Sequence, residues 1–397
     1  MTGQAHVVWD DSLAKYDFGP GHPLAPVRVQ LAMRLARDLG LVQPDHVEVV
    51  PPVVIDDEML LTVHKPEFVE AVRTASADPS HVDLHRGLGT EDVPTFAGMH
   101  EASRAVVGAT LAAVQSVHSG RALHAVNLSG GLHHAMPASA SGFCVYNDIA
   151  VGIQWLLDQG VERVAYIDVD VHHGDGVQAA FWNDPRVLTV SVHESGRALF
   201  PGTGFPGEIG GPDALGTAAN LALPPHTGDD AWLRAFDGVV PQLLHSFKPQ
   251  ILVTQQGCDS HADDPLAHLE LSIDGQRLTY AALHRLAHEV CDGRWVALGG
   301  GGYSWIDVVP RAWSHLIGEV VGTPVPPETP VPAVWRDFVE NWLKVPTPAL
   351  MTDGRTPRVR AWDSGYDPAD PVDAAVLRTR EAVYPWHGLN ADPYHGF

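Results

Sequence analysis

The sequence predicts an α/β fold, in which an open central parallel sheet is flanked by helices in a single domain. From about Glu101 onward, helical patterns alternate with short apolar runs, which is the order expected of parallel strands covered by helices. Polar residues gather directly after several of these runs. The 397 residues are 45% hydrophobic, enough to bury a sizeable core, and no Ser/Gly-rich linker or charge run precedes residue ~320.

Each element follows from its local composition. Helices are expected at Glu101–Val117, which is rich in Ala and Val, and at Ile149–Gln159. The apolar runs expected as strands are Ala122–Leu128, Arg163–Val169, Val187–Val192, Ile251–Thr254 and Trp295–Leu298.

The carboxyl-terminal part differs in composition. Prolines are dense between Gly322 and Pro332, which excludes a helix interior there and predicts an extended strap. A helix is expected at Ala333–Leu343, and Met351–Phe397 is expected to be loop-rich and to wrap the domain surface. The chain is thus expected to contain a main domain over residues 1–320, with a Pro-rich strap and extension over residues 321–397 packed on it.

Charge and cysteine content exclude several classes of protein. Lys+Arg 25 against Asp+Glu 48 gives a net charge of −23, which argues against binding to the phosphates of nucleic acid. Cys144, Cys258 and Cys291 are odd in number and widely spaced, so neither a disulfide framework nor a thiolate zinc cluster is expected. Met1–Leu13 lacks a signal-peptide layout, and no apolar run reaches ~18 residues. We therefore expect a soluble, cytoplasmic protein with no membrane partner.

The polar residues that follow the strands are expected to meet. In an open α/β sheet the ligand crevice lies outside the carboxyl ends of the strands, so segments far apart in sequence can deliver side chains to one place. The segments in question are Ser129–His134, Asp168–Gly176, Gln255–Asp259 and Gly299–Tyr303.

A metal site is predicted among these segments. Asp170 and His172 are two residues apart on an extended segment, so their side chains point the same way and can share a cation. Asp259 is the natural third ligand. Two carboxylates and one imidazole leave open positions and suit a catalytic Zn²⁺, although Fe²⁺, Co²⁺ or Mn²⁺ fit the same ligands. The alternative is that these aspartates are turn and cap residues.

Acid–base and electrophilic groups are predicted beside the metal. His133 or His134 can take a proton from a water at the metal and pass it to a leaving amine. Asp168 and Asp175 can orient the two imidazoles. Four glycines before Tyr303 let a loop bring its phenol over the site, where it would hold a developing oxyanion; the alternative is a plain glycine-rich turn. Phe143 and Phe200 can sandwich an alkyl chain or can simply be core residues.

These residues occur in motifs that resemble those of the zinc-dependent histone deacetylases, and most closely the bacterial acetoin-utilisation-type deacetylases. The likeness spans roughly residues 6–320 and implies an arginase-like α/β fold. The motifs are Asp17–Pro20 with His22-Pro23, Gly87–Asp92, Gly131–His134, Gly142–Asp148, Tyr166–Gly176, Phe200–Gly204 and Gly299–Tyr303. Thr90–Asp92 and Gly257–His261 resemble the acetoin-utilisation branch in particular.

The resemblance implies a role for each matching residue. The implied zinc ligands are Asp170, His172 and Asp259. The implied catalytic residues are His134 paired with Asp175 as general base and then acid, His133 paired with Asp168 as electrostatic support, and Tyr303 on the acetyl oxygen. The implied substrate residues are Gly142, Phe143 and Phe200 along an acyl-lysine tunnel, Asp92 at its rim and Arg28 near an internal cavity for acetate. The implied K⁺ site uses Asp168, Asp170 and His172 with carbonyls near Ser191 and Val192.

The expected function is the zinc-dependent removal of acetyl groups from lysine side chains of proteins, with K⁺ in a structural role. The resemblance suggests acetyl-coenzyme A synthetase, in acetoin and acetate metabolism, as a candidate substrate. Three alternatives remain open: an acetylpolyamine amidohydrolase, an arginase-type hydrolase with two manganese ions, and an inactive acetyl-lysine-binding protein. Retention of His133, His134 and Tyr303 favours an active enzyme. The oligomeric state is left open.

Overall fold

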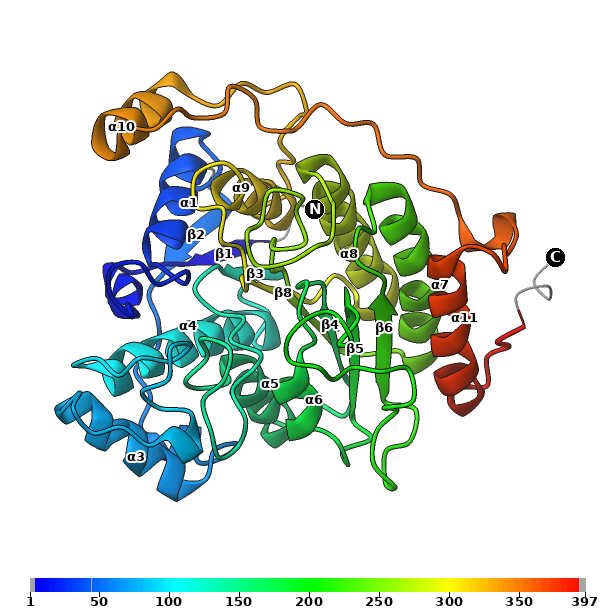
Figure 1. Cartoon of the computed structure of the whole chain (residues 1–397), viewed down its shortest axis with the longest axis horizontal. Helices are drawn as coiled ribbons and strands as arrows, with labels where there is room; N and C mark the ends of the chain where they lie inside the picture. The colour runs from blue at the N-terminus through cyan, green and yellow to red at the C-terminus, as the bar shows by residue number, and fades with distance from the viewer. Residues whose placement is uncertain (1–3, 44, 393–397) are drawn as a thin grey trace.

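The computed structural model describes residues 4–43 and 45–392, which form one parallel sheet between two layers of helices (Figure 1). The sheet has eight strands in the order β2-β1-β3-β8-β7-β4-β5-β6, and every neighbouring pair is parallel. The strands are β1 (Ala5–Val8), β2 (Val47–Val50), β3 (His124–Asn127), β4 (Val164–Asp168), β5 (Val187–Glu194), β6 (Ala218–Leu223), β7 (Ile251–Gln255) and β8 (Trp295–Leu298).

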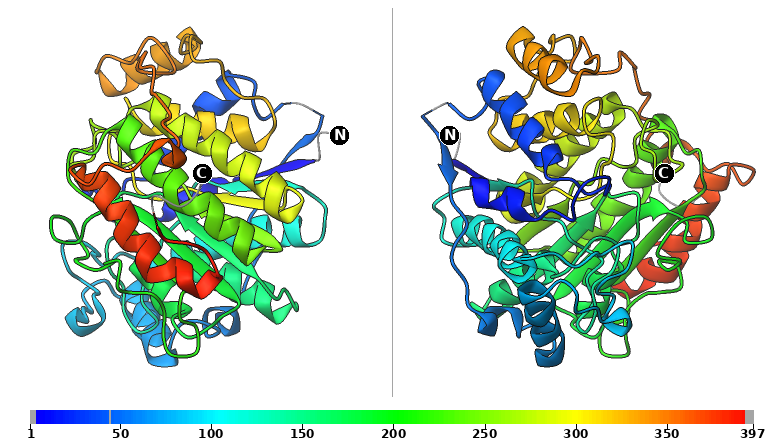
Figure 2. Two further views of the ribbon diagram at one scale, coloured as in Figure 1. Left: turned by 90° about the vertical axis from the view of Figure 1, so that its right-hand side faces the viewer. Right: turned by 60° about the vertical axis from the view of Figure 1, so that its left-hand side comes forward.

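Helices cover both faces of the sheet, as Figures 1 and 2 show. One face carries a row of packed neighbours, in the order α1 (Val27–Asp38), α9 (Val309–Val320), α8 (Ile273–Cys291) and α7 (Asp229–Phe247). The other face carries α4 (Met99–His118) and α5 (Asp148–Asp158). Because both faces are covered, the inner strands read as nearly continuous apolar runs. The remaining α-helices are α2 (Asp57–Leu60), α3 (Pro66–Ala77), α6 (Asp175–Ala180), α10 (Ala333–Leu343) and α11 (Pro371–Val383).

The register of the central strands aligns their carboxyl ends. Asp168, the last residue of β4, lies opposite Ser191 of β5 and Gln255 of β7. Asn127, the last residue of β3, lies opposite Leu298 of β8. The loops that leave β3, β8, β7 and β4 therefore start side by side at one edge of the sheet.

The parallel α/β fold predicted from the sequence is confirmed, and each of the predicted strands is present to within a few residues. The prediction omitted β1, β2 and β6. β1 and β2 precede Glu101, where the predicted alternation of helical and apolar patterns begins, and β6 has the sequence AANLAL, whose small side chains carry little strand preference. Among the described residues, no helix is both long enough and apolar enough to cross a membrane.

The carboxyl-terminal extension contains more helix than predicted. α10 has the expected bounds, and residues 322–332 contain no helix. The expectation of a loop-rich segment over Met351–Phe397 is wrong for α11. This helix begins where Asp370 caps the backbone N–H of Val372 and proline occupies the first helical position, a start signal that the sequence analysis overlooked.

α11 packs on β6 and α7 at the edge of the sheet, beyond the row of helices (Figure 2). Arg234 of α7 donates to the buried carboxylate of Asp373 at 2.6 Å, and the Thr379 hydroxyl donates to the carbonyl of Asn220 on β6 at 2.7 Å. At the other end of the molecule, Trp335 of α10 donates to the carbonyl of Leu31 on α1 at 3.1 Å. The extension thus contacts both ends of the helical layer.

Candidate metal and catalytic site

The candidate metal ligands come from the loops after two adjacent strands, β4 and β7. Asp170 and His172 follow β4, and Asp259 follows β7. Nδ1 of His172 lies 3.1 Å from a carboxylate oxygen of Asp170 and 3.1 Å from one of Asp259. All three side chains are buried, and their ligand atoms lie within 4.8 Å of one another. Two carboxylates and one imidazole at this spacing fit a divalent transition metal.

The electrostatics of this cluster also favour a cation. Burial, together with the charge of Asp170, raises the pKa of Asp259 to about 7. Burial alone would lower the pKa of His172, but the hydrogen bonds and charges of Asp170 and Asp259 outweigh it and raise that pKa to about 10. Both groups thus hold a proton more tightly than they do in water, and a divalent cation can take the place of that positive charge.

Three backbone and side-chain donors fix the two carboxylates. Nε2 of Gln255 donates to Oδ2 of Asp170 at 2.6 Å, and the backbone N–H of Gly301 donates to the same oxygen at 2.8 Å. The N–H of Val171 donates to Oδ1 of Asp259 at 3.0 Å. A Cβ atom at Gly301 would overlap Oδ2 of Asp259, so only glycine allows this close approach. Neither the role of Gln255 nor the close approach of Gly301 was predicted from the sequence.

The two histidines after β3 each pair with a different carboxylate. Nδ1 of His133 lies 2.7 Å from Oδ2 of Asp168, and Nδ1 of His134 lies 2.7 Å from Oδ1 of Asp175. The ring centroids of His133 and His134 are 4.0 Å apart. Each carboxylate orients one imidazole and leaves its Nε2 atom available.

The surroundings of His133 and His134 shift the pKa values of the two imidazoles in opposite directions. Burial opposes the charged form of His133, but Asp168 and Asp170 outweigh burial and raise its pKa to about 9. Burial and the charge of His133 lower the pKa of His134 to about 4, although Asp175 opposes this shift. Near neutral pH one imidazole of the pair is therefore cationic and the other is neutral, a division typical of acid–base sites.

Asp148 holds the loop that carries the two histidines. Its carboxylate accepts hydrogen bonds from the backbone N–H groups of Gly131 at 3.1 Å and Leu132 at 2.8 Å. The Tyr166 hydroxyl donates to Oδ2 of Asp168 at 2.6 Å, which orients the partner of His133. Asp148 and Tyr166 both lie in motifs noted in the sequence, but no role was predicted for either of them.

Tyr303 lies on the loop after β8, next to the residues described above. Its backbone N–H donates to Oδ2 of Asp264 at 2.7 Å. Its ring centroid lies 5.6 Å from that of Phe143. Burial raises the pKa of the Tyr303 phenol well above its usual value, so the hydroxyl keeps its proton and can donate a hydrogen bond. Asp264 is not among the site residues predicted from the sequence.

Two phenylalanines border the site. The Phe200 ring, 43% exposed, lies with its centroid 5.0 Å from that of His134 and 6.3 Å from that of His172. Phe143 lies beside Tyr303 and adopts a positive φ of 66°. A Cβ atom at Gly142 would come within 2.5 Å of the His134 ring and 2.9 Å of the Phe200 ring. Glycine at this position therefore leaves space between the histidine and the phenylalanine.

Asp92 and Arg28 lie farther from the metal ligands. Asp92 is exposed, and its backbone carbonyl lies 3.2 Å from Nε2 of His22, whose ring contacts Phe143 at a centroid distance of 4.7 Å. Arg28 is buried and donates to the carbonyls of Gly300 at 3.2 Å and Gly302 at 2.7 Å. It borders a cavity of about 30 Å³ that Tyr16, Ser129 and Leu132 also line.

The residues expected at the monovalent cation site are also neighbours. Asp168 at the end of β4 is paired in register with Ser191 of β5, and Val192 follows on the same strand. The Ser191 hydroxyl lies 2.8 Å from Nδ1 of His193. Carboxylate and carbonyl oxygens at such a strand end suit a hard cation.

Comparison with known proteins identifies the family. Residues 22–320 match the model of the histone deacetylase domain. The acetoin utilization protein AcuC of Bacillus subtilis (strain 168) is 41% identical over 362 residues, which cover 87% of this chain and 93% of that protein. AcuC of Staphylococcus aureus (strain MRSA252) is 39% identical over 320 residues, which cover 80% of this chain and 82% of that protein.

Solved structures agree with this assignment. An HDAC homolog from Aquifex aeolicus superposes with a TM-score of 0.82 at 26% sequence identity, and the match covers 95% of this chain and 100% of that one. An HDAC homolog in complex with SAHA superposes with a TM-score of 0.83, also at 26% identity and with the same coverage. The arginase-like fold expected from the sequence is thereby confirmed, and the chain belongs to the histone deacetylase family, in which it resembles the acetoin-utilisation-type proteins.

Proposed function

We propose that this protein removes acetyl groups from lysine side chains of proteins by metal-dependent amide hydrolysis. The observation that carries the proposal is that two Asp-paired histidines lie beside the cluster of Asp170, His172 and Asp259, with which Tyr303 also interacts electrostatically. This arrangement contains a metal-binding set, a proton-transfer group and a hydrogen-bond donor for an oxyanion, which are the groups that amide hydrolysis needs.

We propose Asp170, His172 and Asp259 as the ligands of Zn²⁺, with Fe²⁺ or another divalent metal as the alternative occupant. When bound, the metal supplies Lewis-acid polarisation of the acetyl carbonyl and makes water more acidic. A K⁺ ion is proposed beside it, held by Asp168, Asp170 and His172 with the carbonyls of Ser191 and Val192. Its role is structural.

His134 is proposed as the proton-transfer group. Its Nδ1 is engaged by Asp175, so Nε2 is the atom that accepts a proton from the attacking water. The water oxygen bonds to the acetyl carbon, the carbon–nitrogen bond breaks, and the proton on Nε2 passes to the departing lysine amine. The products are acetate and free lysine. His133, held by Asp168, provides positive charge nearby.

Tyr303 and the aromatic residues bind the substrate. The Tyr303 hydroxyl donates a hydrogen bond to the acetyl oxygen and stabilises the negative charge that develops on it. Phe143 and Phe200 line the channel for the lysine alkyl chain, with Gly142 keeping the space beside His134 open. Asp92 at the rim accepts hydrogen bonds from the substrate backbone. The cavity at Arg28 receives the acetate product.

The proposal also covers the protein substrate, the cellular location and the extent of the catalytic domain. The net charge of −23 suits a cationic peptide around the acetyl-lysine, and acetyl-coenzyme A synthetase is the proposed protein substrate. We place the protein in the cytoplasm, since its three cysteines are free and buried. Residues 1–320 form the proposed catalytic domain and residues 321–397 the proposed extension packed on it, of which residues 393–397 lie outside the described residues.

The test is an assay of the purified, metal-analysed protein on an acetyl-lysine peptide and on an acetylated polyamine in parallel. Deacetylation of the peptide that a chelator abolishes and Zn²⁺ restores is the expected result, and SAHA is expected to inhibit it. Activity on the polyamine alone would move the function to small-molecule metabolism. Turnover of neither substrate by metal-loaded protein would contradict the proposal and favour an acetyl-lysine-binding protein.

A further inference from the structure

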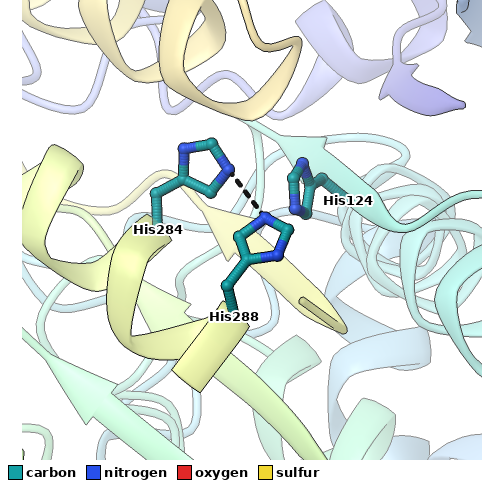
Figure 3. Close-up of side chains that lie close together, drawn as sticks. All are labelled: His124, His284 and His288. Carbon is teal, nitrogen blue, oxygen red and sulfur yellow. Dashed lines mark hydrogen bonds between the residues drawn. The ribbon is translucent and has the colours of Figure 1, made fainter. Parts of the chain in front are cut away.

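A second cluster of metal-binding side chains lies at the opposite end of β3 from the catalytic loops. His124 is the first residue of β3, whereas the catalytic histidines follow its last residue. His284 and His288 lie one turn apart near the carboxyl end of α8 (Figure 3). The three imidazoles from these two elements face one another, and none of them takes part in the proposed catalysis.

The spacing of the nitrogen atoms matches shared coordination. Nε2 of His284 and Nε2 of His288 are 3.2 Å apart, and one ring nitrogen from each of the three histidines lies within 4.8 Å of the other two. Two imidazole nitrogens that bind the same tetrahedral Zn²⁺ at about 2.0–2.1 Å are about 3.3 Å apart. The His284–His288 pair already has this separation, whereas the nitrogen of His124 lies within 4.8 Å of both and would move closer on binding the same ion.

The hydrogen bonds of His124 leave its other nitrogen without a partner. Nδ1 of His124 lies 2.9 Å from the carbonyl oxygen of Val320, so it must carry the proton and donate. Nε2 therefore presents a lone pair toward the cluster, yet it is buried and has no hydrogen-bond partner among the described residues. The side chain is only 8% exposed, and burial together with His284 lowers its pKa to about 4, which keeps it neutral.

The contacts of His284 also favour the tautomer that can bind a metal through Nε2. Its Nδ1 lies 3.4 Å from a carboxylate oxygen of Glu319, which favours a proton on Nδ1 and a lone pair on Nε2. The ring is stacked on Trp295 at a centroid distance of 5.6 Å and an interplanar angle of 19°. A carboxylate behind a histidine is the usual support for a metal-bound imidazole.

We propose that His124, His284 and His288 form a second metal site, which takes Zn²⁺ or a similar transition metal ion such as Ni²⁺ or Cu²⁺. Neutral imidazoles are good ligands for all three ions. His288 is exposed, so a fourth position is open to solvent. A bound ion joins β3 to α8, and Glu319 and Val320 of α9 support two of its ligands.

The ordinary interpretation is that His288 donates a hydrogen bond to His284 and that the cluster has no ligand. It explains the 3.2 Å contact. It does not explain the buried Nε2 of His124, because leaving such a group without a hydrogen-bond partner is unfavourable. A metal ion satisfies all three nitrogens at once.

The test measures zinc binding in a background that lacks the catalytic ligand set. The protein carrying Asp259→Ala is freed of metal with a chelator, titrated with Zn²⁺ in a calorimeter at pH 7.5, and analysed for zinc after gel filtration. One retained Zn²⁺ per chain and a rise of a few degrees in melting temperature are expected. Adding His288→Ala, a surface change that does not disturb the core, is expected to abolish both effects. Adding His81→Ala, at an exposed histidine outside the cluster, is expected to change neither.

Absence of zinc binding in the Asp259→Ala protein would overturn the proposal. Zinc binding that is unchanged by both His288→Ala and His284→Ala would also overturn it. The outcome is independent of the proposed function. His288→Ala in the otherwise unchanged protein is expected to lower the zinc content from two ions to one per chain, with unchanged deacetylation. Two zinc ions per chain in this variant would overturn the proposal.

Discussion

Nε2 of His261 lies 2.9 Å from a carboxylate oxygen of Asp353, and this contact joins the carboxyl-terminal extension to the loop that carries a candidate metal ligand. His261 follows Asp259 by two residues. Asp353 also pairs with Arg311 of α9 at 2.9 Å and accepts the backbone N–H of Ile273 at 2.7 Å. One carboxylate thus connects the extension with the metal-ligand loop and with the start of α8.

Replacement of Asp353 by Asn is expected to destabilise the protein in a pH-dependent way. Burial opposes ionisation of Asp353, but His261, Arg311 and the Ile273 N–H outweigh it and hold its pKa well below the usual value. Because the pKa is lower in the folded state, the stabilisation is fully present above the unfolded value of about 3.9, declines below it, and is lost as the pH falls through the lower folded value. Asp353→Asn should therefore lower the free energy of unfolding by about 1–3 kcal/mol at pH 7 and by somewhat less near pH 3, where the unfolded carboxyl group is mostly protonated.

Urea unfolding at both pH values measures this difference. Asp363→Asn, at an exposed position of the same extension, serves as the control and should change little. An equal loss at pH 7 and pH 3 for Asp353→Asn would show that the carboxylate charge is not the cause.

Substitution of the proposed proton-transfer group and of the proposed oxyanion donor should remove activity without removing the metal. His134→Ala and Tyr303→Phe are each expected to reduce turnover by about 100-fold or more, the size of effect typical of general acid–base and oxyanion groups. Neither side chain belongs to the cluster of Asp170, His172 and Asp259, so zinc content should stay at the wild-type level. Unimpaired turnover in both variants would rule out the proposed mechanism.

Much of the fold and of the candidate metal site could be predicted from the sequence. Trp295–Leu298 was predicted with its observed bounds, since it is an apolar run followed by four glycines. The candidate ligands were equally visible, because Asp170 and His172 stand two apart after a buried strand. β6 could not be predicted in this way. Its alanines form a strand because they pair with β5, where Val190 lies opposite Ala219 of β6.

The supporting residues of the site were not visible in the sequence. Asp264 is one of 48 acidic residues, and its contact with Tyr303 spans 39 positions of the chain. His124 and His284 are 160 positions apart and meet only because α8 packs beside the start of β3, as their ring centroid distance of 4.6 Å shows. Contacts of this kind depend on the three-dimensional packing, and composition or spacing does not reveal them.

Asp264 is predicted to act as a positioning residue for Tyr303. Asn at position 264 keeps one acceptor oxygen but cannot accept from the N–H groups of both Tyr303 and Leu266 as the carboxylate does. We expect Asp264→Asn to lower kcat by about 10- to 100-fold with little change in KM, since small displacements of a catalytic group have effects of this size.

A double substitution distinguishes positioning from a general loss of structure. If Asp264 acts through the phenol, Asp264→Asn should have little further effect on kcat in protein that already carries Tyr303→Phe. Multiplicative losses in the double variant would show that Asp264 acts by another route. Zinc content and melting temperature, measured on the same samples, should change little.

The approach of the Gly301 backbone to the candidate metal ligands yields the last prediction. The N–H of Gly301 donates to Asp170 at 2.8 Å, and a Cβ at position 301 would overlap Oδ2 of Asp259. Gly301→Ala must therefore displace either the loop or a ligand carboxylate, and we expect it to weaken Zn²⁺ binding at this site at least tenfold. Gly207→Ala is the matched control, because a Cβ there meets nothing within 4 Å. Competition with a chelating dye measures both affinities, and wild-type affinity for Gly301→Ala would mean that the glycine loop does not determine the position of the carboxylates.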